Sequence, residues 1–193
     1  MKEQKNDRRS RYTKRFLKES LIELMEEKPI NKISVSELCD KADINRSTFY
    51  NHYSDQYDLL QQMEEEIIDD VNAMLADCEY QKYDSKLMQI LAYIFEYIRD
   101  NSRACRILLS EQGDVHFQKQ ILMIAHESYV TELVTRNRLE EDTATDIYLF
   151  IVNGSIGLIQ SWLKNGMKKS AHEMAELIVR LSGGCVAPFV RKQ

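Results

Sequence analysis

Turn-forming residues are scarce in this chain of 193 residues, which contains 6 Gly and 2 Pro. The first glycine is Gly113, and no proline lies between Pro29 and Pro188. Glycine and proline together make up about 12% of an average protein, and they mark the turns of β-hairpins and the phosphate loops of nucleotide-binding folds. Their absence over such long stretches disfavours both architectures and predicts an all-α fold.

Charge is divided unevenly along the chain, whose net charge is −5. Residues 1–53 carry 12 Lys and Arg against 9 Asp and Glu, whereas residues 54–193 carry 14 against 22. The first 18 residues alone hold 8 basic and 2 acidic side chains. A basic N-terminal segment on an acidic body predicts an anionic partner at that end only.

The cysteines and the apolar runs indicate a protein of the reducing cytoplasm. The four cysteines form no CxxC pair, so we expect free thiols and no zinc site. The N-terminus lacks the apolar run of a secretory signal. The longest uncharged run, residues 147–163, is shorter than the roughly 20 residues that span a bilayer. We therefore expect a buried helix there and no membrane contact.

Apolar periodicity and capping residues predict about nine helices. Pro29 should end the first helix, Ser34 and Glu37 form a capping-box pattern, and Asn45 and Asp55 are preferred N-cap residues. The expected helices span about residues 10–27, 35–42, 45–52, 55–77, 84–101, 103–111, 115–134, 141–164 and 170–190.

Residues 35–52 predict a helix-turn-helix unit, because two short capped helices are joined by a tight turn at Asp43 and Ile44. Cys39 is the small residue where the two helices should cross. The second helix presents hydrogen-bonding side chains outward, as a recognition helix requires for base edges and phosphates. These side chains are Arg46, Ser47, Thr48, Tyr50, Asn51 and His52.

Residues 33–60 resemble the DNA-binding domain of the TetR family of bacterial transcriptional regulators. The run Phe49-Tyr50-Asn51-His52-Tyr53, followed by Leu59-Leu60, carries the resemblance most specifically, and the match extends over about residues 10–60. The resemblance implies that the second helix enters the major groove of DNA. The implied contacts are Arg46, Ser47, Thr48, Tyr50, Asn51 and His52, with Ser36 reaching a phosphate.

Two positions depart from the family pattern. Asp43 stands where the family usually has Gly, and we expect the turn to survive because Asp tolerates a left-handed backbone better than most residues. Gln56 stands where the family usually has a Lys that contacts phosphate. A neutral donor in place of a cation predicts a salt dependence weaker by about one charge.

A single helix-turn-helix reads one half-site, so specific binding predicts a homodimer. The last two expected helices combine small residues with an apolar stripe, which lets a facing helix approach closely. The resemblance to the TetR family implies a four-helix interface at the same place. The candidate interface residues are Phe150, Gly154, Gly157, Leu158, Trp162, Leu177 and Leu181.

The family resemblance also implies a ligand pocket among the C-terminal helices. Arg106 and His126 stand out there, because polar groups among apolar helices require partners, and they suit a moderately apolar or anionic inducer. The candidate ligand-binding residues are Met88, Tyr93, Tyr97, Arg106, Met123, His126 and Tyr129.

These patterns predict an all-α, two-part regulator, with DNA binding in residues 1–54 and dimerisation and ligand sensing in residues 55–193. The predicted function is that of a homodimeric repressor on a palindromic operator, released by a small molecule and needing no cofactor or metal. A transcriptional activator and a regulator that answers to a protein partner remain alternatives. A helical interaction module without DNA binding and an enzyme remain remote ones, since no GxGxxG, Walker, HExxH or GxSxG motif occurs.

Overall fold

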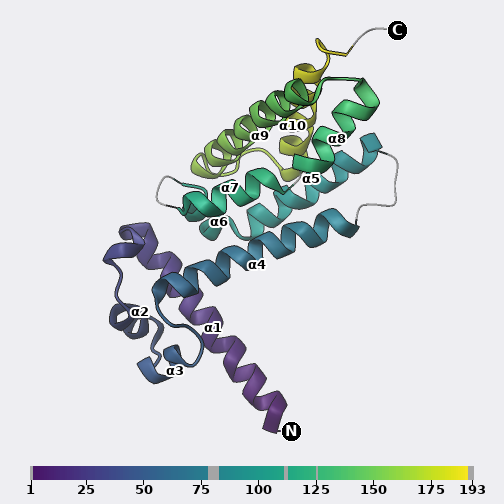
Figure 1. The fold of residues 1–193 in the computed structure, drawn as a ribbon. Coiled ribbons are helices and arrows are strands. Elements are labelled where there is room, and N and C mark those ends of the chain that lie inside the picture. Colours follow the sequence, from purple (N-terminus) through teal and green to yellow (C-terminus); the bar gives the residue numbers. More distant parts are fainter. Residues whose placement is uncertain (1, 78–82, 111–112, 125, 191–193) are drawn as a thin grey trace. The chain divides into compact units, whose positions relative to one another are not determined.

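The computed structural model describes residues 2–77, 83–110, 113–124 and 126–190, and in these ranges every regular element is helical. The predicted all-α fold is confirmed (Figure 1). The elements are α1 (Lys2–Glu27), the short 3-10 helix η1 (Ile30–Lys32), α2 (Val35–Ala42), α3 (Arg46–Tyr50), α4 (Gln56–Asp77), α5 (Tyr83–Asp100), α6 (Ser102–Leu108), α7 (Val115–Met123), α8 (His126–Asn137), α9 (Glu141–Lys164) and α10 (Ala171–Val186).

The chain divides into two compact units, Met1–Ile67 and Ile68–Gln193. The division falls within α4, whereas the sequence-based boundary at residues 54 and 55 precedes that helix. α4 therefore contributes its N-terminal half to the first unit and its remainder to the second.

The first unit has a core formed by α1, α2, α3 and the start of α4. Leu17 and Leu21 on α1, Leu38 on α2, Phe49 on α3 and Leu59 on α4 are completely buried. Two ion pairs join the exposed edges of α2 to the end of α1: Lys41 Nζ lies 3.0 Å from a Glu23 carboxylate oxygen, and Lys28 Nζ lies 2.5 Å from Glu37 Oε1. α2 is thus fixed against α1 on both its apolar and its polar sides.

The second unit is built on two packed helix pairs, α5 with α10 and α8 with α9. Phe95 on α5 and Leu108 on α6 are almost fully buried, as are Phe117 on α7 and Leu163 on α9. A further buried cluster lies between α8 and α9 around Leu133, Ala144 and Tyr148. Within the described residues, no helix is long and apolar enough to cross a membrane.

The expected single helix over residues 115–134 is wrong, because the structure contains α7 and α8, which end at Met123 and Asn137. Neither glycine nor proline marks the break, so the local pattern gave no sign of it. Both α7 and α8 pack against α9, and a change of direction between them lets each bury its own apolar side.

Helix termini also differ from their predicted positions. α1 begins at Lys2 rather than near Ser10, and α10 ends at Val186 rather than Val190. At the predicted capping box, the Glu37 amide donates to Ser34 Oγ, and the Glu37 carboxylate accepts from the Ser34 backbone and also pairs with Lys28. A capping box also starts α10, between Ser170 and Glu173, where the same Ser-x-x-Glu spacing signals it.

Candidate nucleic-acid interface

α2 and α3 form the predicted helix-turn-helix. At their crossing, α2 contributes the small residue Cys39 and α3 contributes Phe49. Cys39 on α2 is 2% exposed and Phe49 on α3 is fully buried. Each helix has a capped N-terminus: Ser34 Oγ accepts from the Glu37 amide at 3.2 Å, and Asn45 Oδ1 accepts from the Ser47 amide at 2.8 Å. These caps satisfy backbone donors that a five-residue helix such as α3 cannot satisfy internally.

The turn between the two helices places Asp43 in the left-handed region, with φ 54° and ψ 45°. The Ile44 amide donates to the Cys39 carbonyl at 3.0 Å, which closes the end of α2. The turn therefore forms with Asp in the conformation that glycine adopts most cheaply.

This turn geometry predicts that Asp43→Gly is more stable than Asp43→Ala by about 1 kcal/mol or more, because alanine has no local hydrogen bond to offset a positive φ. Urea unfolding of the two variants measures the difference. Equal midpoints would show that the turn relaxes to an ordinary backbone when Asp43 is replaced.

The outward surface of α3 carries the side chains that the sequence singled out. Arg46, Ser47, Tyr50 and Asn51 are exposed, and Thr48 is half-buried. The Tyr50 side chain is 57% exposed and meets Phe49 edge-on, with ring centroids 5.5 Å apart. Because Phe49 is held in the core, the Tyr50 ring leaves the surface in a fixed direction.

Ser36 and Arg46 are joined across the two helices. The Arg46 guanidinium donates to Ser36 Oγ, so the two candidate contacts form one linked polar group instead of two separate ones. Sequence spacing could not reveal this pair, since ten residues separate its members. The bond holds the guanidinium at the N-terminal end of α3.

His52 lies half-buried just after α3, and Lys14 of α1 is its main charged neighbour. Desolvation and then the Lys14 charge lower the pKa of His52 from its usual value. The imidazole is therefore neutral at pH 7 and can both donate and accept a hydrogen bond.

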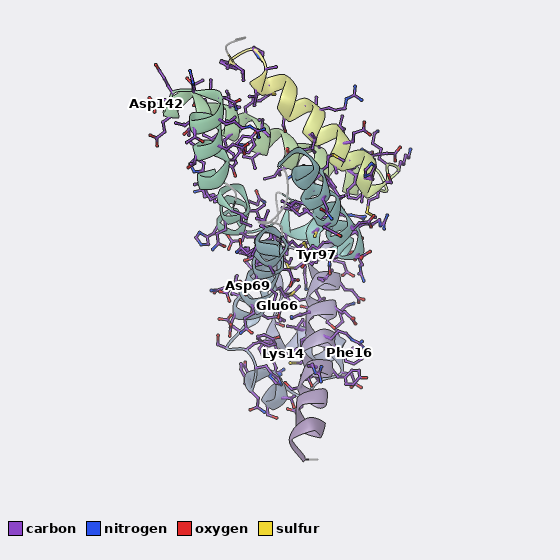
Figure 2. All side chains as sticks on the ribbon, turned by 90° about the vertical axis from the view of Figure 1, so that its right-hand side faces the viewer. Lys14, Phe16, Glu66, Asp69, Tyr97 and Asp142 are labelled. Atoms are coloured by element: carbon purple, nitrogen blue, oxygen red, sulfur yellow. The ribbon has the colours of Figure 1, made fainter. Side chains whose placement is uncertain are left out.

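Figure 2 shows Lys14 and Phe16 leaving α1 on different sides. Of the basic segment, Arg11 is exposed, and the side chains of residues 2–9 lie outside the described set.

Gln56 opens α4 and is half-buried. Asp55 caps this helix as predicted, since its Oδ1 accepts from the amides of Tyr57 and Asp58 at 2.8 and 2.9 Å. Asp58 in turn accepts from the Ser54 amide at 2.7 Å, which lowers the pKa of Asp58. The capped first turn of α4 therefore holds Gln56 at a helix N-terminus.

Within the part of the chain that the structure describes, the buried hydroxyl of Tyr53 has no hydrogen-bond partner. Burial, followed by the charges of Glu66 and Asp58, raises the pKa of Tyr53 to about 12. Its role is packing, with its ring centroid 5.7 Å from that of Phe49.

We expect Tyr53→Phe to stabilise the protein by about 1 kcal/mol at pH 7, because it removes an unsatisfied buried hydroxyl while keeping the ring. The raised pKa adds a pH dependence: the wild-type stability falls as the pH rises from 10 toward 12, since the unfolded tyrosine loses its proton first. Thermal unfolding of both proteins across this range should show a shallower fall in the variant. A variant less stable than wild type at pH 7 would mean that the hydroxyl has a partner.

The seven candidate ligand residues do not gather at one site. His126 and Tyr129 both pack against the Tyr148 ring, at 5.0 and 5.7 Å between centroids. The Tyr97 hydroxyl donates to Asp70 at 2.9 Å, and Figure 2 labels Tyr97 on α5. The others lie apart: Tyr93 and Met123 are more than half exposed, Met88 is half-buried, and Arg106 is exposed on α6.

The candidate interface residues divide into an exposed set and a buried one. Phe150 on α9 is 70% and Leu181 on α10 is 50% exposed, and Gly154 and Gly157 on α9 are also exposed. Leu158 and Leu177 are half-buried. Trp162 is misplaced in this set: it is 6% exposed, packs edge-on against Phe95, and donates its indole N–H to the Lys169 carbonyl at 2.9 Å. It belongs to the core of the second unit.

The fold and the site define the class of protein as helix-turn-helix regulators with a helical C-terminal unit. A sequence model described as bacterial regulatory proteins of the tetR family matches residues 19–63, and one described as a transcriptional regulator C-terminal region matches residues 85–184. The second match alone spans half of the chain. This chain belongs to the TetR family of bacterial regulatory proteins.

One curated relative is the HTH-type dhaKLM operon transcriptional activator DhaS of Lactococcus lactis, which is 30% identical over 95 residues. The match covers 47% of this chain and 48% of that protein, so the chain spans about half the length of the curated relative.

Similar solved structures support the fold. A TetR regulator of Streptococcus agalactiae is 22% identical, with a TM-score of 0.63, over 92% of this chain and 97% of that one. NalD of Pseudomonas aeruginosa, titled the secondary repressor of a multidrug efflux pump, is 14% identical, with a TM-score of 0.68, over 91% and 97%. FadR of Bacillus subtilis, solved with stearoyl-CoA, is 14% identical, with a TM-score of 0.65, over 86% and 96%. These relatives are transcriptional regulators rather than enzymes.

Proposed function

We propose that this protein is a sequence-specific DNA-binding regulator that acts in the bacterial cytoplasm as a homodimer on a palindromic operator. The observation that carries the proposal is α3, a short capped helix whose exposed face is polar and whose exposed aromatic side chain, Tyr50, packs edge-on against the buried Phe49. A recognition helix needs this combination of a rigid base and outward hydrogen-bonding groups.

The proposed contacts divide into two kinds. Base edges would be met by Arg46 and Tyr50, which are exposed one helical turn apart on α3, and by the half-buried Thr48. Backbone phosphates would be met by groups around it, which fix the register without reading sequence. This second set is Ser36, Ser47, Asn51, His52 and Gln56.

The proposed dimer forms through α9 and α10. A Cβ added at Gly154, Gly157, Gly183 or Gly184 would meet no other atom of the described ranges within 4 Å, so packing among those residues does not require glycine at these positions. The exposed Phe150 lies one helical turn before Gly154 on α9, and the exposed Leu181 is on α10 with Gly183 and Gly184. Small residues next to exposed apolar ones suit close approach by a second copy of this chain, and Trp162 is left out of this face.

Repression by occlusion of a promoter is the proposed mode of action, since a dimer bound to an operator needs no further activity to block polymerase. Activation is the second candidate, because the relative DhaS is described as a transcriptional activator. A reporter fused to the target promoter separates the two: deletion of the gene raises expression for a repressor and lowers it for an activator.

Release from the operator is proposed to follow binding of a small molecule in the second unit, a mode that the stearoyl-CoA complex of FadR supports for a structural neighbour. A protein partner could act on the same unit instead. Adding purified candidate molecules to the protein–operator complex, without any other protein, tests whether a small molecule alone causes release.

The DNA-binding proposal is tested by fluorescence anisotropy on duplexes that tile the DNA around the protein's own gene, at two salt concentrations. We expect tight binding to one palindromic duplex, and weaker, more salt-sensitive binding to the rest. Equal affinity for all duplexes at both salt concentrations would contradict sequence-specific recognition.

A further inference from the structure

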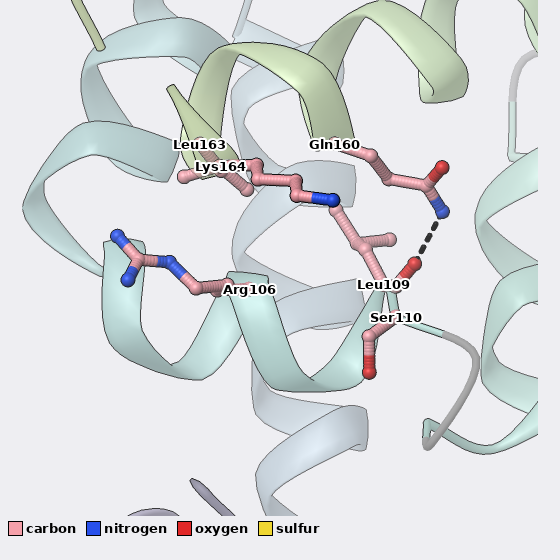
Figure 3. Close-up of a pocket in the computed structure, with 6 residues that line it drawn as sticks. All are labelled: Arg106, Leu109, Ser110, Gln160, Leu163 and Lys164. Carbon is pink, nitrogen blue, oxygen red and sulfur yellow. Dashed lines mark hydrogen bonds between the residues drawn. The ribbon is translucent and has the colours of Figure 1, made fainter. Parts of the chain in front are cut away.

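The second unit contains a hollow of about 400 Å³ between the end of α6 and the end of α9. Its volume lies in the range of small-molecule sites, roughly 300–1,000 Å³. Figure 3 shows the side chains around it, which come from both helices and from the residues that follow α6. They are Arg106, Leu109, Ser110, Gln160, Leu163 and Lys164.

The floor of the hollow is apolar and held in the core. Leu163 is 1% exposed and Leu109 is 7% exposed. The Gln160 amide donates to the Leu109 carbonyl, a bond drawn in Figure 3. On the other side, Gln118 of α7 donates to the Ser110 carbonyl at 2.8 Å. The segment after α6 is thus tied to both α9 and α7, and the hollow has fixed walls.

Two exposed cations flank this floor, Arg106 in the last turn of α6 and Lys164 at the end of α9. Among the described residues, neither makes an ion pair or a hydrogen bond. Figure 3 shows the two side chains extending in different directions along the hollow, so their charges lie toward different parts of it.

Cations at the ends of helices commonly bind the last carbonyl groups, but side chains of other residues have taken that role here. Gln160 serves the Leu109 carbonyl, Ser110 Oγ donates to the Ile107 carbonyl at 2.7 Å, and the Asn165 amide donates to the Ser161 carbonyl at 2.8 Å. Helix capping therefore does not account for the two cations Arg106 and Lys164.

We propose that this hollow binds a small organic anion, whose carboxylate or phosphate group is held by Arg106 at one part of the hollow or by Lys164 at another, with an apolar body against Leu109 and Leu163. This site extends the proposed function by naming the class of ligand. Only the effect of the anion on DNA binding rests on the proposed function. The binding itself is independent of DNA. It also relocates the ligand site, since of the seven sequence-based candidates only Arg106 lines the hollow.

Trp162, the only tryptophan of the chain, precedes Leu163 and gives an intrinsic fluorescence signal beside the site. The full-length protein is titrated with octanoate and, separately, with octyl phosphate, and each is compared with the neutral octanamide. We expect a saturable change in fluorescence with one or both anions. The affinity for octanamide should be about ten-fold or more lower than the affinity for the anion, since hydrogen bonds to charged groups contribute most.

The double variant Arg106→Gln, Lys164→Gln should weaken anion binding by about ten-fold or more. The matched variant Lys119→Gln, Lys168→Gln removes two exposed charges outside the hollow and should bind as the wild type does. Circular dichroism and sedimentation of both variants check that fold and assembly are retained. The proposal would be overturned if the two variants bound the anion equally well, if octanamide bound as tightly as the anions, or if no saturable signal appeared.

These outcomes are separate from those of the DNA-binding experiment. Operator binding without anion binding would leave the proposed function intact and remove this site. Anion binding without operator binding would keep the site and contradict the function. If both hold, adding the anion to the protein–operator complex shows whether the site regulates DNA binding.

Discussion

Replacing Gly157 with Glu should convert the proposed dimer into a monomer. The residue is exposed on α9, and a Cβ added there would meet no other atom of the described residues within 4 Å, so the single unit has room for the larger side chain. In a close helix–helix interface the same carboxylate would be buried without a partner, which costs about 3–5 kcal/mol. Sedimentation equilibrium should show the dissociation constant of the dimer rising by a factor of about 100 or more.

The matched control is Gln120→Glu, which adds the same charge at an exposed position of α7. It should sediment as the wild type does. Circular dichroism of Gly157→Glu should show undiminished helix, because Glu has the higher helix propensity. A variant that remains a dimer would place the interface on another face of the second unit. Operator affinity should fall together with dimerisation, since each protomer reads one half-site.

Replacing Tyr50 with Ala should lower the affinity for the operator by about 1–3 kcal/mol, the cost of losing one base contact. The stability of the protein should change little, because the side chain is 57% exposed and its neighbour Phe49 stays in the core. Anisotropy titrations on the operator and on an unrelated duplex measure the change. The loss should be confined to the operator, so that the variant discriminates less between the two.

Tyr57→Ala provides the control, since Tyr57 is 47% exposed on α4 of the same unit and is not a proposed contact. The control should bind as the wild type does. Equal losses in the two variants would mean that α3 is not the reading helix. Arg46→Gln tests a second base contact, and it should lower the affinity for the operator by about 1–3 kcal/mol.

Local signals predicted most of the helices and the frame of the candidate site. Pro29 marks the end of α1, Asn45 and Asp55 cap the helices that follow them, and the scarcity of glycine and proline disfavoured a hairpin-rich β fold. Asp43 takes the left-handed turn that its position required. Each of these features depends on residues a few positions apart, so the sequence displays them directly.

Features that depend on distant residues were beyond the sequence. The bond between Arg46 and Ser36 joins two helices, and Trp162 lies in the core because Phe95, far back in the chain, covers it. Apolar periodicity places a residue on a face of its helix, but it does not say whether that face meets the same chain or another molecule.

The sequence by itself determined an all-α chain with an N-terminal helix-turn-helix, because capping, turn and periodicity signals act over a few residues. Only the tertiary structure decided which polar side chains meet. Arg106 and Lys164 lie 58 positions apart, yet both line one hollow because α6 ends beside the last turns of α9. The packing of helices against a shared core sets that proximity, and no local pattern encodes it.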